Sequence, residues 1–234
     1  MSKSNFDFME ENNDLINCYY RTKMKLYAQR AEKEVYNNPI LSIQYSRDFL
    51  IWFLKGIVFQ ENLKRFIKST DHNILKYIKI IKNHISFELP SFCFTSMNEI
   101  LKINDLIQQK NSNMKNSEIV NNALNALKYD FYLAVLFTNV YYFLSDNFPE
   151  YHQPSKNIMS DENKNKKTDE NYELPHVFYD MIPGMPGNFC PVQKPIPLSI
   201  EKKSLRAKMT TQHFKHLFAT SSIKLNVEEK STSF

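Results

Sequence analysis

The sequence predicts an all-α protein, and three observations lead to this fold class. Glycine accounts for only 3 of 234 residues, and two of the three stand in one short run, so the remainder is suited to helices. Apolar residues recur at the 3.6-residue spacing of amphipathic helices in several segments. Most of these segments follow a Ser, Thr, Asn or Asp that can cap a helix. With 42% hydrophobic and 14% aromatic residues, the chain can also fill a core.

The first two helices are expected on either side of a proline. Residues 15–36 carry an apolar stripe flanked by Arg and Lys, which is typical of a half-exposed helix. The segment 37–39 (NNP) should end this helix, because the residue before a proline resists the helical conformation. A second helix is expected to start at 46–48 (SRD) and to continue through the apolar run FLIWFLKGIVF, which indicates a central, buried helix.

A third helix is expected after 69–71 (STD), with apolar residues on one face and lysines on the other. Because the linker is short, this helix and the preceding one are predicted to form an antiparallel hairpin. The expected apolar face consists of Ile74, Leu75, Ile78, Ile81 and Ile85, and the opposite face carries Lys76, Lys79 and Lys82.

Beyond Pro90, the helical periodicity of apolar residues is weaker over residues 97–109, and a polar linker follows at 112–116. Ser117 is then expected to cap a long helix that reaches about Asp146, with Glu118 at its positive end. The second half of this helix, residues 131–144, is the most apolar stretch of the chain. It is shorter than the roughly 20 residues that span a bilayer, so a buried core helix is favoured over a membrane helix.

The domain organisation follows from changes in composition. Residues 1–152 are predicted to form a helical domain, and the polar stretch 153–171 a disordered insertion. Residues 172–226 should hold a Pro/Gly connector and a C-terminal helix from Ser199 or Ser204 to about Ala219, followed by a frayed tail over 227–234. The apolar residues of this helix are Leu205, Met209, Phe214, Leu217 and Phe218, and its basic face is Lys202, Lys203, Arg206, Lys208 and Lys215.

Charge and cysteine content narrow the classes of function. The formal net charge of +5 is spread along the chain among acidic residues, which argues against a nucleic-acid-binding protein. Three distant cysteines, Cys18, Cys93 and Cys190, favour buried thiols in a reducing compartment over a disulfide framework. The acidic N-terminal stretch has no apolar core of a signal peptide, so no secretory signal is expected.

No catalytic constellation stands out in the sequence. His213 and His216 are one helical turn apart, but no third ligand lies nearby, so solvated histidines are favoured over a metal site. No phosphate-binding GxGxxG or GxxxxGKS pattern occurs. We therefore expect no catalytic residue, no metal and no cofactor, and a protein that is not an enzyme. The aromatic stripe of the long helix is expected to be core, with a partner interface as the alternative; it consists of Tyr129, Tyr132, Tyr141, Tyr142 and Phe143.

Gly184 and Gly187, the two glycines that stand close together, mark the most specific local feature of the sequence. In the run PGMPG the prolines fix φ and the glycines permit positive φ, so two tight turns are expected there. Together with the hairpin, this connector resembles the p21 subunit (subunit 3) of the actin-related protein 2/3 complex. The similar segments are LIWFLKGIVFQEN at 50–62, DHNILKYIKII at 71–81, IPGMPGNFCPV at 182–192 and LRAKMTTQ at 205–212.

The resemblance covers about a third of the chain and leaves clear departures. The family's basic, proline-containing N-terminal arm and its aromatic, basic C-terminal tail are not evident, and an extra helix and a polar insertion separate the hairpin from the connector. The resemblance implies an all-α subunit without catalysis that contacts the actin-related protein 3 subunit in the cytoplasm and cytoskeleton, with the nucleus as a second location. The expected contact residues are Met185, Asn188 and Phe189 of the connector and Arg206, Lys208 and Lys215 of the last helix.

Two alternatives stay open at this point. One is a helical scaffold subunit of another assembly, organellar or chromosome-segregating, that docks through the aromatic helix at 131–144. The other is a membrane-associated subunit in which the same helix meets lipid. For the basic face of the last helix, ordinary solvation is the competing interpretation.

Overall fold

The computed structural model describes residues 4–10, 18–67, 73–110, 114–142, 148–155 and 198–220. Within these ranges every regular element is a helix, which confirms the all-α fold class. The chain divides into two compact units, Met1–Pro154 with Ile196–Phe234 and, separately, Ser155–Pro195. The connector and most of the polar insertion lie outside the described residues, so their predicted boundaries stay predictions.

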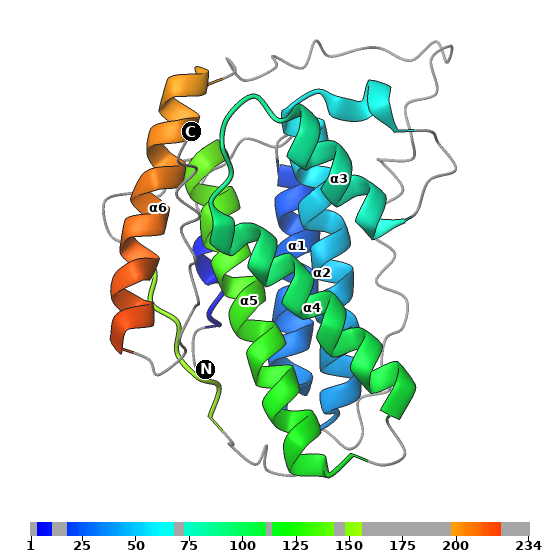
Figure 1. Ribbon diagram of the computed structural model, residues 1–234. Coiled ribbons are helices and arrows are strands. Elements are labelled where there is room, and N and C mark those ends of the chain that lie inside the picture. The colour runs from blue at the N-terminus through cyan, green and yellow to red at the C-terminus, as the bar shows by residue number, and fades with distance from the viewer. Residues whose placement is uncertain are drawn as a thin grey trace, which may run out of the picture. The chain divides into compact units, whose positions relative to one another are not determined.

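The described residues of the first unit form six α-helices and two short 3-10 helices (Figure 1). The central helices are α2 and α5, because each packs against α1 and α4 as well as against the other. In addition, α3 packs on α2, and α6 packs on α5. The bounds are η1 Asp7–Glu10, α1 Cys18–Glu34, α2 Pro39–Gln60, η2 Leu63–Phe66, α3 Ile74–His84, α4 Ser91–Lys110, α5 Asn116–Tyr142 and α6 Ile200–Thr220.

The start of α2 differs from the sequence prediction. Pro39 opens this helix and Asn38 caps it, with the Asn38 side chain accepting a hydrogen bond of 3.2 Å from the Leu41 amide. Pro39 therefore separates α1 from α2, as predicted, and is also the first residue of α2. The expected start at Ser46 is wrong, since Ser46 is fully buried inside α2.

A second difference is α4, which covers the region of weak pattern. Its buried side includes Met97 and Ile100, but also the polar residues Ser96 and Asn104. Because polar residues share the buried face, the apolar periodicity is diluted and the helix is hard to recognise from sequence.

The long helix α5 begins at Asn116, so the predicted cap Ser117 lies within its first turn. The Lys115 carbonyl accepts the first hydrogen bonds, from the amides of Glu118 and Ile119 at 3.0 and 3.1 Å. Residues 130–140 are all buried, which confirms the prediction of a core helix. In the described ranges no helix has the length and apolar composition needed to cross a membrane.

The cap of α3 is Asn73, whose side chain accepts a hydrogen bond of 2.9 Å from the Leu75 amide. The expected cap at 69–71 lies outside the described residues. On the apolar face, Ile74, Ile80 and Ile81 are buried. Leu75, predicted to share that face, is instead 63% exposed. The predicted hairpin of α2 and α3 stays a prediction.

Gly56 lets α2 and α5 approach closely. A Cβ atom at this position would lie 2.9 Å from two ring atoms of Phe137, a side chain only 1% exposed. We expect Gly56→Ala to lower the free energy of unfolding by about 1–3 kcal/mol through overpacking, although alanine favours a helix by roughly 1 kcal/mol. Urea unfolding followed by circular dichroism measures the change. In a Phe137→Leu background the loss should shrink, and an equal loss there would contradict the contact.

Candidate partner-binding site on the last helix

One stripe of α6 faces the rest of the bundle. Over residues 200–215, whose side chains are described, the buried positions are Lys203, Ala207, Thr210 and Phe214, which are spaced four, three and four residues apart. Two of these four residues are polar, so polar contacts contribute to holding this part of α6. Figure 1 shows α6 at one side of the bundle, next to α5.

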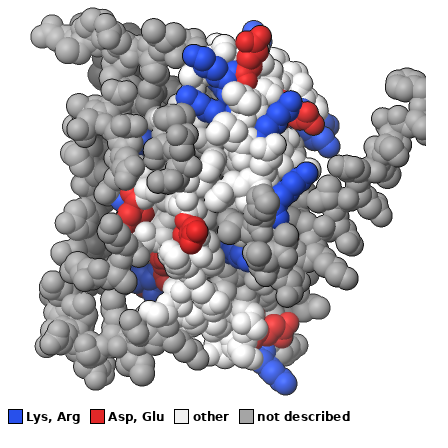
Figure 2. All heavy atoms as spheres, turned by 90° about the vertical axis from the view of Figure 1, so that its left-hand side faces the viewer, with Lys and Arg blue, Asp and Glu red and all other residues white. Residues whose placement is uncertain are grey.

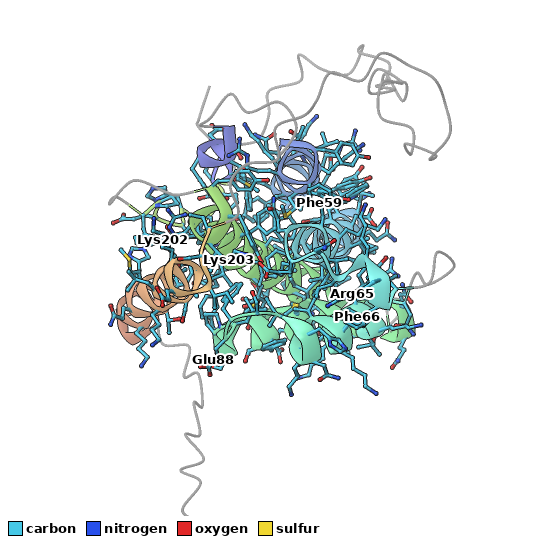
Figure 3. The ribbon with its side chains drawn as sticks, turned by 90° about the horizontal axis from the view of Figure 1, so that it is seen from above. Phe59, Arg65, Phe66, Glu88, Lys202 and Lys203 are labelled. Atoms are coloured by element: carbon cyan, nitrogen blue, oxygen red, sulfur yellow. The ribbon has the colours of Figure 1, made fainter. Side chains whose placement is uncertain are left out.

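The first polar contact is an ion pair between Lys203 and Glu61, the residue that ends α2. The Lys203 Nζ lies 2.6 Å from Glu61 Oε1, and the two side chains are only 9% and 3% exposed. The hydroxyl of Ser86, beyond the end of α3, donates a hydrogen bond of 2.7 Å to Glu61 Oε2. Figure 3 looks down on this end of the bundle, where Lys203 lies on the inner side of α6 and Lys202 lies farther out.

Tyr141 of α5 completes this polar cluster. Its hydroxyl is buried, and the residue as a whole is half-buried. Burial and the nearby Glu61 carboxylate both raise the pKa of Tyr141 well above its usual value. The Lys203 Nζ lies 5.6 Å from the centre of the Tyr141 ring. Glu61 therefore joins four segments: the end of α2, the α3–α4 loop, α5 and α6.

The middle of α6 is held by Asn139 of α5. The Asn139 amide donates to the Thr210 hydroxyl at 2.9 Å and to the Arg206 carbonyl at 3.1 Å. In return, the Arg206 guanidinium donates to the carbonyls of Asn139 and Val140, both at 3.4 Å, near the end of α5. Burial lowers the pKa of Arg206. Two helices are thus linked by hydrogen bonds in both directions.

Aromatic packing holds the lower part of α6. The Phe214 ring packs between Tyr132 and Phe92, at centroid distances of 4.7 and 5.2 Å. His213 stacks on Phe148 at 4.6 Å and is only half-exposed, so the expectation of a solvated histidine is wrong for it. The side chain of His216 lies outside the described side chains.

The opposite face of α6 is exposed and partly apolar. Leu205 is 60% exposed and Met209 is 39% exposed, one turn apart, although the sequence grouped both with the apolar residues of this helix. Lys208 and Lys215 are also exposed on this side. Figure 2, which faces α6, shows Lys and Arg side chains gathered in its upper part, with acidic side chains among them. We call Leu205, Lys208, Met209 and Lys215 the outward face of α6.

The predicted contact residues separate into three groups. Met185, Asn188 and Phe189 lie outside the described residues. Lys208 and Lys215 are on the outward face, whereas Arg206 lies about 160° around the helix from Lys208 and binds α5. Lys203, counted with the basic face, is buried. The sequence analysis missed Leu205 and Met209, and the 203/207/210/214 spacing was the signal that could have identified them.

Asp130, in the middle of α5, is a second unusual group. Its side chain is fully buried, and burial raises the pKa of its carboxyl well above the usual value. The nearby hydroxyl of Ser46 on α2 opposes this rise in the pKa of Asp130. Among the described residues, however, neither carboxylate oxygen of Asp130 has a hydrogen-bond partner with acceptable distance and angles.

Among the described residues, no group of three His, Cys, Asp or Glu side chains is placed to hold a metal ion. A cavity of about 10 Å³ beside Phe137 has an entirely apolar lining and is close to the size of one water molecule. Cys93 is fully buried, as predicted for a structural thiol, and burial raises its pKa.

Comparisons of the chain with profiles of protein families, with curated protein sequences and with solved structures gave no match.

Proposed function

We propose that this chain is a non-catalytic helical subunit of an actin-filament-nucleating complex. It contacts an actin-related protein through the outward face of α6 and through the connector residues Met185, Asn188 and Phe189. By binding the filament-like arrangement of the complex more tightly than the open one, it shifts the equilibrium toward the active state. The proposed location is the cytoplasm, at the cytoskeleton.

The observation that carries the proposal is the outward face of α6. A helix that docks alone normally turns its large apolar residues inward, yet α6 exposes Leu205 and Met209 while burying Lys203 and Thr210. Two apolar side chains beside Lys208 and Lys215 suit a partner surface that is acidic and partly apolar. A neighbouring subunit would bury the exposed apolar side chains.

The polar contacts of α6 support the same proposal. Because Glu61 and Asn139 fix α6 at two levels, its outward face is held in place before a partner arrives. A preorganised surface loses less conformational entropy on binding than a mobile one. Three of the four segments that resemble the p21 subunit fall on α2, α3 and α6, and the first of them, 50–62, contains Glu61, which pairs with Lys203 of α6.

The alternative docking surface at 131–144 has weaker support. Its described residues up to Val140 are buried within this chain, so little of them is available to another protein. A scaffold that docks through this helix would first have to open the bundle.

The experiment is affinity purification of the tagged full chain from native extract, with mass spectrometry of the eluted proteins. We expect actin-related proteins to co-elute with the wild-type chain. Leu205→Ser combined with Met209→Ser should reduce their recovery about tenfold, while stability changes by less than about 0.5 kcal/mol because both residues are exposed. Leu75→Ser, at an apolar residue 63% exposed on α3, is the matched control and should retain them.

Two outcomes would contradict the proposal in different ways. A stoichiometric set of proteins without any actin-like member would overturn the assembly. Equal recovery of actin-related proteins by the wild type and by the double α6 variant would overturn the docking surface alone.

A further inference from the structure

Away from α6, the first two helices carry a cluster of half-exposed aromatic rings surrounded by lysines. Tyr19 and Tyr20 lie near the start of α1, and Trp52 and Phe59 lie on α2. The Trp52 ring is 5.5 Å from Tyr19 and 6.2 Å from Tyr20, and Tyr20 is 5.1 Å from Phe59. We call these four residues, together with Lys23, Lys55 and Lys64, the aromatic–lysine surface.

The three lysines lie over the rings. The Nζ atoms of Lys23 and Lys55 are 5.6 and 4.7 Å from the Trp52 ring centre, and that of Lys64 is 5.3 Å from the Phe59 ring centre. In the described part of the chain, none of the three forms an ion pair with a carboxylate. Burial raises the pKa of Asp48, one turn before Trp52, and the nearby Arg47 opposes this rise. Among the described residues, the charges of these three lysines are therefore not neutralised by an ion pair.

The chemistry of this surface selects the kind of partner. Because lysines already cover Trp52 and Phe59, those ring faces are not available for stacking nucleic-acid bases, which disfavours RNA and DNA. The ring edges and the ammonium groups are what a partner can reach. Carboxylates can pair with the ammonium groups, and aliphatic side chains can pack on the aromatic edges. Tryptophan and tyrosine are also frequent hot spots of protein interfaces.

The shape of the surface favours a helix. Trp52, Lys55 and Phe59 occupy one stripe of α2 that is about 10 Å long, which matches two turns of an opposing helix. Phe59 is 38% exposed, and Figure 3 shows it beside α1 and α2, away from Lys202 of α6. Burial and the nearby Arg30 lower the pKa of Lys23, so an added carboxylate would relieve an unfavourable charge.

We infer that the aromatic–lysine surface binds an acidic amphipathic helix of a partner protein, one that carries Leu or Ile on one face and Asp or Glu beside it. This surface is separate from the outward face of α6. This surface can bind such a helix whichever assembly the chain joins. With two separate surfaces, the chain can contact two partners at once.

Trp52 supplies the test, because it is the only tryptophan of the sequence. The probe is a synthetic acidic helix of about 16 residues with leucines at positions i, i+4 and i+7, flanked by glutamates and free of tryptophan. We expect its addition to the full chain to change the Trp52 emission. Binding should weaken strongly between about 50 and about 300 mM salt, as expected for lysine–carboxylate pairs.

Matched charge variants locate the binding. Lys23→Gln, Lys55→Gln and Lys64→Gln together should weaken peptide affinity about tenfold or more. The control removes the same charge elsewhere, by Lys79→Gln, Lys82→Gln and Lys115→Gln, three exposed lysines on other surfaces. This control variant should bind the peptide like the wild type.

Three results would overturn the inference. The first is an unchanged Trp52 emission at saturating peptide. The second is an equal loss of affinity in both triple variants, which would show only a non-specific effect of net charge. The third is tighter binding of a uridine 20-mer than of the peptide at the same surface, which would make it a nucleic-acid site. Circular dichroism of both variants verifies that they remain folded.

Discussion

Replacing Lys203 by methionine is expected to lower the free energy of unfolding by about 3–5 kcal/mol, because the change leaves the buried Glu61 carboxylate without its counter-ion. Glu61 is 3% exposed and retains the Ser86 hydroxyl, but one neutral hydrogen bond cannot replace a positive charge at 2.6 Å. Urea unfolding followed by circular dichroism measures the loss.

The controls separate loss of the pair from loss of a lysine. Lys202→Met removes the neighbouring, exposed lysine and should change stability by less than about 0.5 kcal/mol. The double variant Glu61→Gln with Lys203→Met removes both charges and should recover most of the stability. If the double variant is as unstable as Lys203→Met alone, the buried charge is not the cause.

The same variant should also loosen α6 before the rest of the bundle. Glu61 joins α6 to the end of α2, whereas the core around α2 and α5 does not depend on Lys203. Limited proteolysis of Lys203→Met should therefore cut within α6 while a fragment holding α1 to α5 persists. Cleavage spread evenly over all helices would contradict this local role.

The second large effect concerns pH. In the unfolded chain Asp130 ionises near pH 4, whereas in the folded chain burial keeps its carboxyl protonated to a much higher pH. Between these two pKa values the folded state binds one more proton than the unfolded state. The free energy of unfolding should therefore fall as pH rises, by about 1.4 kcal/mol per pH unit from this group, and then level off above the folded pKa.

Asp130→Asn tests this expectation, because the amide is similar in shape and does not titrate. Urea unfolding at pH values from about 4 to 8 should show a smaller decline in stability for this variant than for the wild type. Asp105→Asn, at an exposed position on α4, is the control and should retain the wild-type profile. Parallel pH profiles of wild type and Asp130→Asn would show that Asp130 does not carry a raised pKa.

The sequence predicted most elements of the fold but fewer of their boundaries. The apolar run after residue 48 and the aromatic stretch 131–144 identified the two central helices, because a helix buried on most sides has few polar positions. The start of α2 was misjudged because Pro39 can both end one helix and open the next. The helix α4 was not recognised because Ser96 and Asn104 interrupt its buried face.

The candidate site was predicted less well than the fold. Lys208 and Lys215 are exposed as expected, but Arg206 and Lys203 serve contacts within the chain. Leu205 and Met209 were listed with the apolar residues of the helix and not among its contact residues, because large apolar residues on a helix usually face inward. That rule fails where the surface offers polar partners such as Glu61 and Asn139 to the docking helix.

By itself the sequence determined the all-α class, the central place of the two most apolar helices and the buried character of Cys93, because these depend on composition and local periodicity. Only the tertiary structure decided which face of α6 points inward, that Glu61 is paired with Lys203, and that lysines gather around Trp52. These features join residues far apart in the chain. Their energies depend on burial and on the distance between charges, which local periodicity does not contain.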